Sequence, residues 1–246
     1  MLRVDGLTIS ADRRPLVEGL AFDLAEAAIT CIIGPSGCGK TSVLKWIAGV
    51  LPPELKATGT ARLDGAPLAA PHAALAYQPQ QDTLFPWLTI AENACLGLEV
   101  AGARRAAARN QVLPLFAPFG LAGHEDSFPD QLSGGMRQRA AFLRTMVQDS
   151  RFLLLDEPFS ALDAVTRLKM QHWLCTRLTE RPRGVLMVTH DLYEATQMAD
   201  RVVVMSAQSG GIAADIPLTT PRSDRTEASL AKTRALLKSL LLEDPE

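Results

Sequence analysis

Residues 34–41 read GPSGCGKT, and they follow AITCII, an apolar run of strand length. Three glycines let the backbone N–H groups of such a loop turn inward around an anion without Cβ clashes. The helical pattern TSVLKWIAGVL comes next, so the positive end of a helix dipole would face the same anion. The pattern predicts a phosphate-binding loop, because a plain surface turn would leave the lysine between glycine and threonine unexplained.

Two side chains of this loop have expected roles. Lys40 would bridge the β- and γ-phosphates of a nucleotide, and Thr41 would place its hydroxyl on Mg²⁺. We expect the helix that follows to end at the breaker Pro52-Pro53.

The segments before the loop predict antiparallel strands. LRVDGLTIS and PLVEGLAFDL alternate apolar and polar residues on either side of the polar turn ADRR. GTARLDGAPL predicts another strand, with a turn at Asp64-Gly65.

The segments after the loop are first helical and then alternate strand with helix. From Leu88 to about Val147 the pattern is mostly helical; it opens with a capping box at Thr89–Glu92 and is interrupted by three prolines. FLLLD (152–156), VLMVT (185–189) and VVVM (202–205) are apolar runs of strand length. We therefore expect an α/β fold: a P-loop NTPase core with a mainly parallel sheet, an N-terminal antiparallel β subdomain and an inserted α-helical subdomain.

These patterns also predict how the chain is divided. We expect a single nucleotide-binding domain over 1–246, with a core of about 1–87 and 151–221, a helical subdomain at 88–150 and a helical tail at 222–246. The tail holds TEASLAKTRALLKSLLLE, an amphipathic pattern that we expect to dock on its own domain rather than on a membrane.

Composition limits the class of protein. The 246 residues are 47% apolar but only 5% aromatic, which suits an aliphatic core of buried parallel strands. A net charge of -2 gives no basic field for nucleic acid. The four cysteines lack CxxC spacing, and the chain shows neither a signal peptide nor an apolar run of roughly 18–20 residues. We expect a soluble, cytoplasmic protein with reduced cysteines.

Chemistry-bearing residues follow two of the predicted strands. Asp156 and Glu157 come at the end of FLLLD, and His190 comes at the end of VLMVT. Ligands bind at this edge of open α/β sheets. Asp156 suits Mg²⁺ coordination, Glu157 suits polarisation of an attacking water, and His190 suits contact with a γ-phosphate.

A second glycine motif, LSGGMRQR, occupies residues 132–139. Ser133 is a natural N-cap, and Gly134 and Gly135 would admit a close approach to the backbone at a helix start. The motif therefore predicts a second anion site, remote in sequence from the first.

GPSGCGKT, LSGGMRQR, FLLLDEP, SALD and the histidine of VTHD, in this order, resemble the ATP-binding subunit of an ABC transporter over nearly the whole chain. The resemblance implies a head-to-tail dimer in which each ATP lies between the first loop of one copy and the LSGG signature of the other. It implies ATP and Mg²⁺ as cofactors, and it implies a Q-loop glutamine seven positions before the tryptophan of a PW pair. Gln80 has that spacing to Trp87, and Gln78 is the alternative.

The resemblance, together with the chemistry above, gives three sets of candidate residues. The expected catalytic residues are Glu157, His190 and Gln80. The expected metal-binding residues are Thr41, Gln80 and Asp156. The expected nucleotide-binding residues are Gly34, Pro35, Ser36, Gly37, Cys38, Gly39, Lys40, Thr41, Ser133, Gly134, Gly135 and, in SALD, Asp163. One position departs from the family: no aromatic residue stands near Ala11 to stack on adenine, which leaves Arg13 or Arg14 as candidates.

The resemblance also implies partners. Because the chain carries only a nucleotide domain, a separate transmembrane permease and a solute-binding protein are expected, with this chain at the inner face of the cell membrane. Phe85, Pro86 and Trp87 lie where the family receives a coupling helix of the permease, although burial of these aromatics in the subdomain core is the alternative. The FPWLT segment is most similar to the importer group for nitrate, sulfonates, taurine and thiamine precursors.

Other functions fit the sequence less well. An ABC-type ATPase that acts on nucleic acid or the ribosome is the main alternative, but the gap of about ninety residues between the two glycine motifs suits one subdomain rather than a long coiled coil. A small-molecule kinase would not explain LSGG or SALD.

Overall fold

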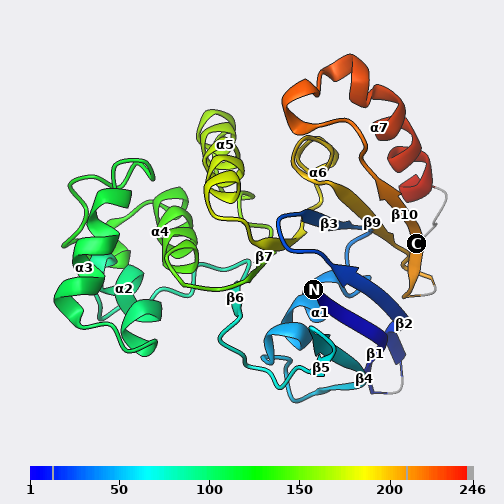
Figure 1. The fold of residues 1–246 in the computed structure, drawn as a ribbon, viewed down its shortest axis with the longest axis horizontal. Coiled ribbons are helices and arrows are strands. Elements are labelled where there is room, and N and C mark those ends of the chain that lie inside the picture. Colours follow the sequence, from blue (N-terminus) through cyan, green and yellow to red (C-terminus); the bar gives the residue numbers. More distant parts are fainter. Residues whose placement is uncertain (13, 209, 243–246) are drawn as a thin grey trace.

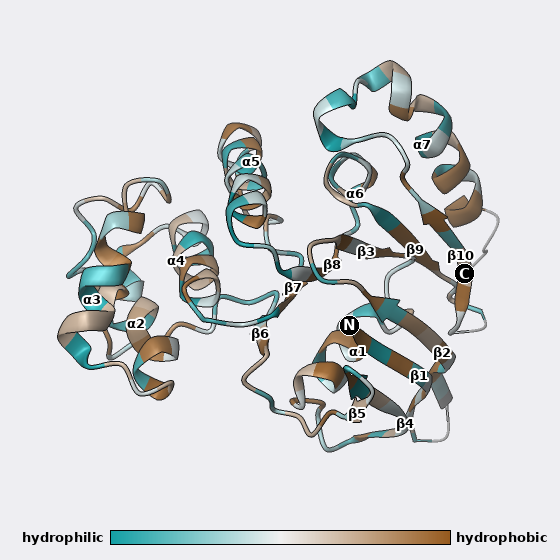
Figure 2. Cartoon of the chain, in the orientation of Figure 1, coloured by the Kyte–Doolittle hydropathy of each residue, from teal (hydrophilic) through white to brown (hydrophobic). Residues whose placement is uncertain are grey.

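The structure is a computed structural model that describes residues 1–12, 14–208 and 210–242 of the chain. Figure 1 shows two β-sheets, with one group of helices set apart from them around α2, α3 and α4. Hydrophobic residues concentrate on the central strands β3, β7, β8 and β9, as Figure 2 shows.

A six-stranded sheet forms the centre of the fold. β3, β7 and β8 are buried at every residue, which explains why their sequences are uninterrupted apolar runs. The strand order is β10-β9-β3-β8-β7-β6, with β10 antiparallel at one edge and the other neighbours parallel. The strands are β3 (Ile29–Ile33), β6 (Leu75–Gln78), β7 (Phe152–Asp156), β8 (Gly184–Val188), β9 (Arg201–Met205) and β10 (Ile212–Pro217).

A four-stranded antiparallel sheet, in the order β2-β1-β4-β5, packs beside this core. Its strands are β1 (Leu2–Ala11), β2 (Arg14–Leu24), β4 (Leu55–Leu63) and β5 (Ala66–Pro67). Asp64 and Gly65 both have positive φ (51° and 84°), as a tight hairpin between β4 and β5 requires. The predicted turn and the predicted antiparallel strands are both confirmed.

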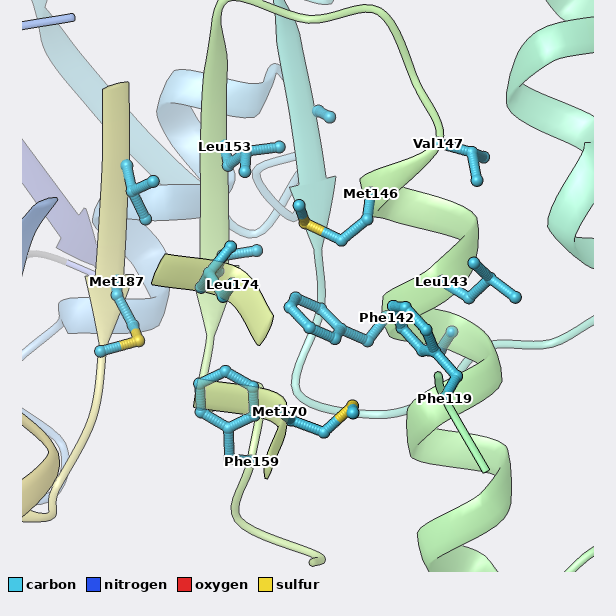
Figure 3. Packing of buried hydrophobic residues seen from close by; sticks show 14 of the residues in the cluster. Phe119, Phe142, Leu143, Met146, Val147, Leu153, Phe159, Met170, Leu174 and Met187 are labelled. Carbon is cyan, nitrogen blue, oxygen red and sulfur yellow. The ribbon is translucent and has the colours of Figure 1, made fainter. Parts of the chain in front are cut away.

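The inserted helices are α2 (Ile90–Val100), α3 (Arg105–Val112) and α4 (Gly134–Met146), with 3₁₀ turns at Leu113–Leu115 and Pro129–Gln131. Thr89 and Glu92 form the predicted capping box. Aromatic side chains join this group to the core: the Phe142 ring lies 5.3 Å from Phe159, and Phe119 lies 4.6 Å from Trp173 on α5 (Ala164–Glu180). Figure 3 shows Phe142 between α4 and the segment after β7.

The first helix is shorter than its apolar pattern predicted. α1 (Lys40–Ala48) ends at Gly49, whose φ of 77° closes the helix, so the expectation that it runs to Pro52-Pro53 is wrong. A Cβ at Gly49 would also lie 2.7 Å from the backbone of Ala70. A glycine C-cap thus ends the helix before the chain reaches the prolines.

The C-terminal helix α7 (Glu227–Leu242) docks on its own domain, as predicted. Leu230 and Leu237 are buried against α6 (Leu192–Met198) and β9. Arg234 lies over the Tyr193 ring at 4.2 Å and donates to the Thr196 hydroxyl at 2.8 Å. Within the described residues, no helix has the length and apolar character that would let it cross a bilayer.

Substituting Leu237 by alanine tests this docking. Leu237 is fully buried and its neighbour Leu236 is 48% exposed. Urea unfolding of Leu237→Ala should show a loss of about 2–5 kcal/mol in the free energy of unfolding, whereas Leu236→Ala should change it by less than about 0.5 kcal/mol. Equal effects of the two substitutions would mean that α7 is not held as described.

Candidate functional site

The GPSGCGKT loop joins the central strand β3 to α1. Gly37 and Gly39 have φ of 83° and 93°, a conformation that other residues rarely adopt. Packing also requires glycine at two positions: a Cβ at Gly34 would lie 2.7 Å from the Met205 carbonyl oxygen, and one at Gly39 would lie 2.5 Å from Val17 Cγ2. Both the shape of the loop and its fit into the core therefore depend on its glycines.

Lys40 folds back over this loop. Its Nζ donates to the Gly34 carbonyl at 2.8 Å and the Pro35 carbonyl at 2.7 Å, and lies 3.7 Å from Cys38 Sγ. Lys40 and Cys38 are buried, whereas Ser36 and Gly37 are exposed. The ammonium group is thus held at the loop, where it would meet an anion that the loop N–H groups bind.

Asp156 and Thr41 form the next layer of the site. Thr41 Oγ1 donates to Asp156 Oδ1 at 3.0 Å, and Asp156 is only 1% exposed. Its Oδ2 is buried with no hydrogen-bond partner in the described part of the chain. Burial raises the pKa of Asp156, although the hydrogen bond from Thr41 opposes this. A buried carboxylate oxygen with unused lone pairs, next to a hydroxyl, is a donor set that fits a hard divalent cation.

Three predicted catalytic side chains meet at one carboxylate. Gln80 Nε2 donates to Glu157 Oε2 at 3.2 Å, and His190 Nδ1 lies 3.2 Å from Glu157 Oε1. Glu157 has a φ of 47°, and its backbone N–H is bonded to the Val188 carbonyl at 2.9 Å. A non-glycine residue in this strained conformation, between the ends of two central strands, is typical of a functional position.

The two glutamines that the sequence left as alternatives have different surroundings. Gln78 lies inside β6, fully buried, and its amide atoms have no hydrogen-bond partner in the described residues. Gln80 lies in the loop after β6 and contacts Glu157. The structure therefore brings Gln80, not Gln78, to the predicted catalytic residues.

The second glycine motif opens α4, away from the first loop. Ser133 caps the helix by accepting a hydrogen bond from the Met136 N–H at 3.4 Å, and Ser133 and Gly134 are exposed. A Cβ at Gly134 would meet only Arg137 Nη2, at 3.9 Å, so packing within this chain does not require glycine there. Among the described residues, no hydrogen bond or ion pair joins 132–135 to 34–41.

Asp163, in the SALD segment, is the N-cap of α5. Its carboxylate accepts a hydrogen bond from the Thr166 N–H at 3.0 Å, and the bonds from Thr166 lower the pKa of Asp163. The residue is exposed, so a partner molecule can reach it.

The sequence interpretation missed the contacts that hold the Gln80 loop against α4. Arg137 Nε pairs with Asp82 at 3.0 Å, and the Arg144 guanidinium donates to the Asp82 and Thr83 carbonyls, each at 2.9 Å. Gln138 Nε2 lies 3.5 Å from the Gln80 carbonyl. These side chains lie on α4, whose other face is buried in the core, and their partners are more than fifty residues away in the sequence. No local spacing pattern signals such a pairing.

Two predicted features lie outside the catalytic group. Phe85 and Trp87 are 41% and 69% exposed and have ring centroids 5.3 Å apart, so these aromatics are not buried in the subdomain core. Ala11 is the last residue of β1, whereas the sequence pattern placed it in the turn ADRR. Arg13, one candidate for stacking on adenine, lies outside the described residues, as does the side chain of Arg14.

The fold and site define a P-loop nucleotide-binding domain with an acidic pair and a histidine at the carboxyl edge of its sheet. A family model described as ABC transporter matches residues 17–160. The chain belongs to this family, and it is an ATP-binding, ATP-hydrolysing subunit.

Relatives and solved structures agree with this assignment. The chain is 37% identical to the formylaminopyrimidine import ATP-binding protein ThiZ of Halalkalibacterium halodurans, covering 94% of this chain and 91% of that protein. It is 38% identical to the taurine import ATP-binding protein TauB of Yersinia pestis, covering 86% and 82%. The dimeric post-hydrolysis structure of the ATP-binding cassette MJ0796 with ADP and Pi is 25% identical, with a TM-score of 0.80 over 90% of this chain and all of that one.

Removal of the Lys40 ammonium should abolish nucleotide binding or hydrolysis, because no other buried cation contacts the loop carbonyls among the described residues. Equilibrium binding of a fluorescent ATP analogue to Lys40→Ala, together with phosphate release, measures this. Lys56→Ala removes an exposed lysine from β4 and should behave as wild type. Normal turnover by Lys40→Ala would show that the loop does not bind the phosphates.

Proposed function

We propose that this ATPase drives solute import and that two copies share each ATP. In the proposed pair the copies lie head to tail, and each ATP contacts residues 34–41 of one copy and residues 133–135 of the other. Hydrolysis would then remove the ligand that holds the copies together. The fold of each copy leaves its two anion sites unconnected, so a second chain is needed to bring them onto one nucleotide.

The observation that carries this proposal is the exposed start of α4. Gly134 is the first residue of α4 and is exposed, and among the described residues no packing contact requires glycine there. An approach of phosphate to the backbone from outside would explain the glycine, since N–H groups at a helix start bind anions. The dimer described for the MJ0796 cassette supports the same arrangement.

The catalytic roles follow from the contacts at Glu157. Its carboxylate is placed to accept a proton from the attacking water, with His190 on one oxygen and Gln80 near the other. These two neighbours fix the direction of the carboxylate, which positions the base before substrate arrives. The Lys40 ammonium would exchange its two loop carbonyls for β- and γ-phosphate oxygens.

A magnesium ion completes the proposed site. Thr41, Asp156 and Gln80 are the residues that would hold it, with the phosphates and water as the remaining ligands. When bound, Mg²⁺ neutralises charge on the phosphoryl group.

The proposed partners are a separate transmembrane permease and a solute-binding protein, with this chain on the cytoplasmic face of the membrane. The exposed Phe85 and Trp87, with Pro86 between them, form the surface for the permease, since exposed aromatic side chains are enriched at protein interfaces. The relatives ThiZ and TauB are named for import of formylaminopyrimidine and taurine. We infer a small polar solute of the nitrate, sulfonate, taurine and thiamine-precursor group.

An ATPase that acts on nucleic acid or the ribosome has less support. Among the described residues, the inserted helices between the two glycine motifs are α2 and α3, and neither of them is a long helical arm. The reported relatives are import subunits.

Light scattering on Glu157→Gln protein, with and without ATP, tests the shared site. Without its base the protein should bind ATP but not consume it, so a monomer should become a dimer only when ATP is added. The matched control adds Ser133→Arg to the same variant, which should still bind ATP and remain monomeric. A Glu157→Gln protein that binds ATP and stays monomeric would contradict the proposal that ATP joins the pair.

A further inference from the structure

A cavity of about 250 Å³ lies between the end of α3, the end of α4 and the last turns of α5. Val147 and Arg183, which line it, come just before β7 and β8 respectively. The cavity is therefore at the amino ends of the parallel strands, on the opposite edge of the sheet from Asp156 and His190. It does not belong to the nucleotide site.

The floor of this cavity is apolar and already formed. Figure 3 shows Met146 and Val147 at the end of α4, where they line the cavity with Trp173, Leu115 and Leu178. The Trp173 ring is fixed by an edge contact with Phe119 at 4.6 Å, and the Arg177 guanidinium lies 5.5 Å from its centre. A pocket with rigid aromatic and aliphatic walls needs little reorganisation to bind an apolar group.

The rim of the cavity carries three arginines, and two of them already have carboxylate partners. Arg177 pairs with Glu180 at 2.6 Å, and Arg181 pairs with Asp149. These pairs are exposed, so their charges are also screened by water.

Arg183 is the third arginine that lines the cavity. It is only 6% exposed, and within the described residues no carboxylate lies within ion-pair distance of it. Among the described residues, its guanidinium makes one hydrogen bond, to the Met146 carbonyl at 3.4 Å, at the end of α4. Burial and the neighbouring Arg181 charge lower the pKa of Arg183, although the more distant Asp149 carboxylate opposes this. A helix terminus offsets part of a positive charge, but less than a carboxylate would.

The Nε and Nη2 groups of Arg183 are not sealed from solvent, so these donors are available to an anion that enters the cavity. The planar fork of the guanidinium matches the two oxygens of a carboxylate, or two of the three oxygens of a sulfonate. Inorganic anions fit this cavity less well than organic anions do, because an inorganic anion would make no apolar contact with Trp173 and Leu178. The volume is below the range of roughly 300–1,000 Å³ for drug-sized ligands, so the ligand is small.

We propose that this cavity is a binding site for a small organic anion, whose carboxylate or sulfonate pairs with Arg183 and whose apolar body packs on Trp173 and Leu178. The site is independent of the nucleotide, so its occupation requires neither ATP nor a second copy of the chain.

Tryptophan fluorescence measures this binding directly. The chain has three tryptophans, so a Trp46→Phe, Trp87→Phe variant keeps Trp173 as its only one. Titration with benzenesulfonate should change the Trp173 emission saturably at or below millimolar concentration. Benzenesulfonamide, which has the same shape without the charge, and inorganic sulfate, which lacks the ring, should each bind at least tenfold more weakly.

Arg183→Met in the same background isolates the charge. This substitution introduces an apolar side chain of similar length and should leave the midpoint of thermal unfolding unchanged or raised, because it removes a largely buried charge that has no carboxylate within ion-pair distance among the described residues. It should weaken benzenesulfonate binding at least tenfold. Arg62→Gln removes a positive charge from exposed β4 and should leave binding unchanged. Leu115→Phe, which fills the cavity and keeps Arg183, should also abolish the response and serves if Arg183→Met does not fold.

The proposal is overturned if benzenesulfonate produces no saturable response, or if the sulfonamide or sulfate binds as well as the sulfonate. It is also overturned if Arg183→Met binds as wild type does. Because ATP is absent from these titrations, none of these results depends on the shared nucleotide site.

Discussion

The hydrogen bond between Thr41 and Asp156 is the contact on which the catalytic edge depends. It joins the first turn of α1 to the end of β7, so the phosphate loop and the acidic pair have one fixed separation. The neighbouring strands support it: β8 lies between β3 and β7, and Asp156 pairs in register with Val188. Since β3, β7 and β8 are parallel, the residues that follow them emerge at one edge, and that edge is where the loop, Glu157 and His190 meet.

The rest of the fold holds several residues at this edge in unfavourable surroundings or backbone conformations. Asp156 buries a carboxylate oxygen that has no partner among the described residues, and Glu157 adopts a positive φ. Lys40 is buried as well. Each of these features costs stability, and the continuous aliphatic core of β3, β7 and β8 offsets that cost. Strained or underbonded residues of this kind are typical of functional sites.

Local signals made much of this fold predictable. The phosphate loop, the buried strands, the Asp64-Gly65 turn and the Thr89 capping box each depend on a few consecutive residues, so the sequence contains them in full. The same reasoning placed the end of α1 too late, because Gly49 stops the helix before Pro52-Pro53. It did not predict β10, an edge strand with alternating exposure.

The site was predictable in its residue types but not in its contacts. The family's usual spacing to the tryptophan of the PW pair favoured Gln80 over Gln78, yet only the fold shows which glutamine contacts Glu157. Arg137 pairs with Asp82, which is distant in the sequence. Arg183 is buried, and among the described residues it has no carboxylate within ion-pair distance. A single chain gives no signal for such long-range pairs. In the proposed pair, the exposed start of α4 contacts the nucleotide of the second copy, a contact that no single chain contains.

Mixing two inactive variants tests the shared site most directly. Lys40→Ala damages the phosphate loop, and Ser133→Arg damages the signature turn. In a head-to-tail pair of one chain of each kind, one site contains both lesions and the other contains neither. The account predicts that ATP hydrolysis by the mixture clearly exceeds the summed rates of the separate variants. A mixture no more active than that sum would contradict it, because a site contained within one chain cannot be restored by another.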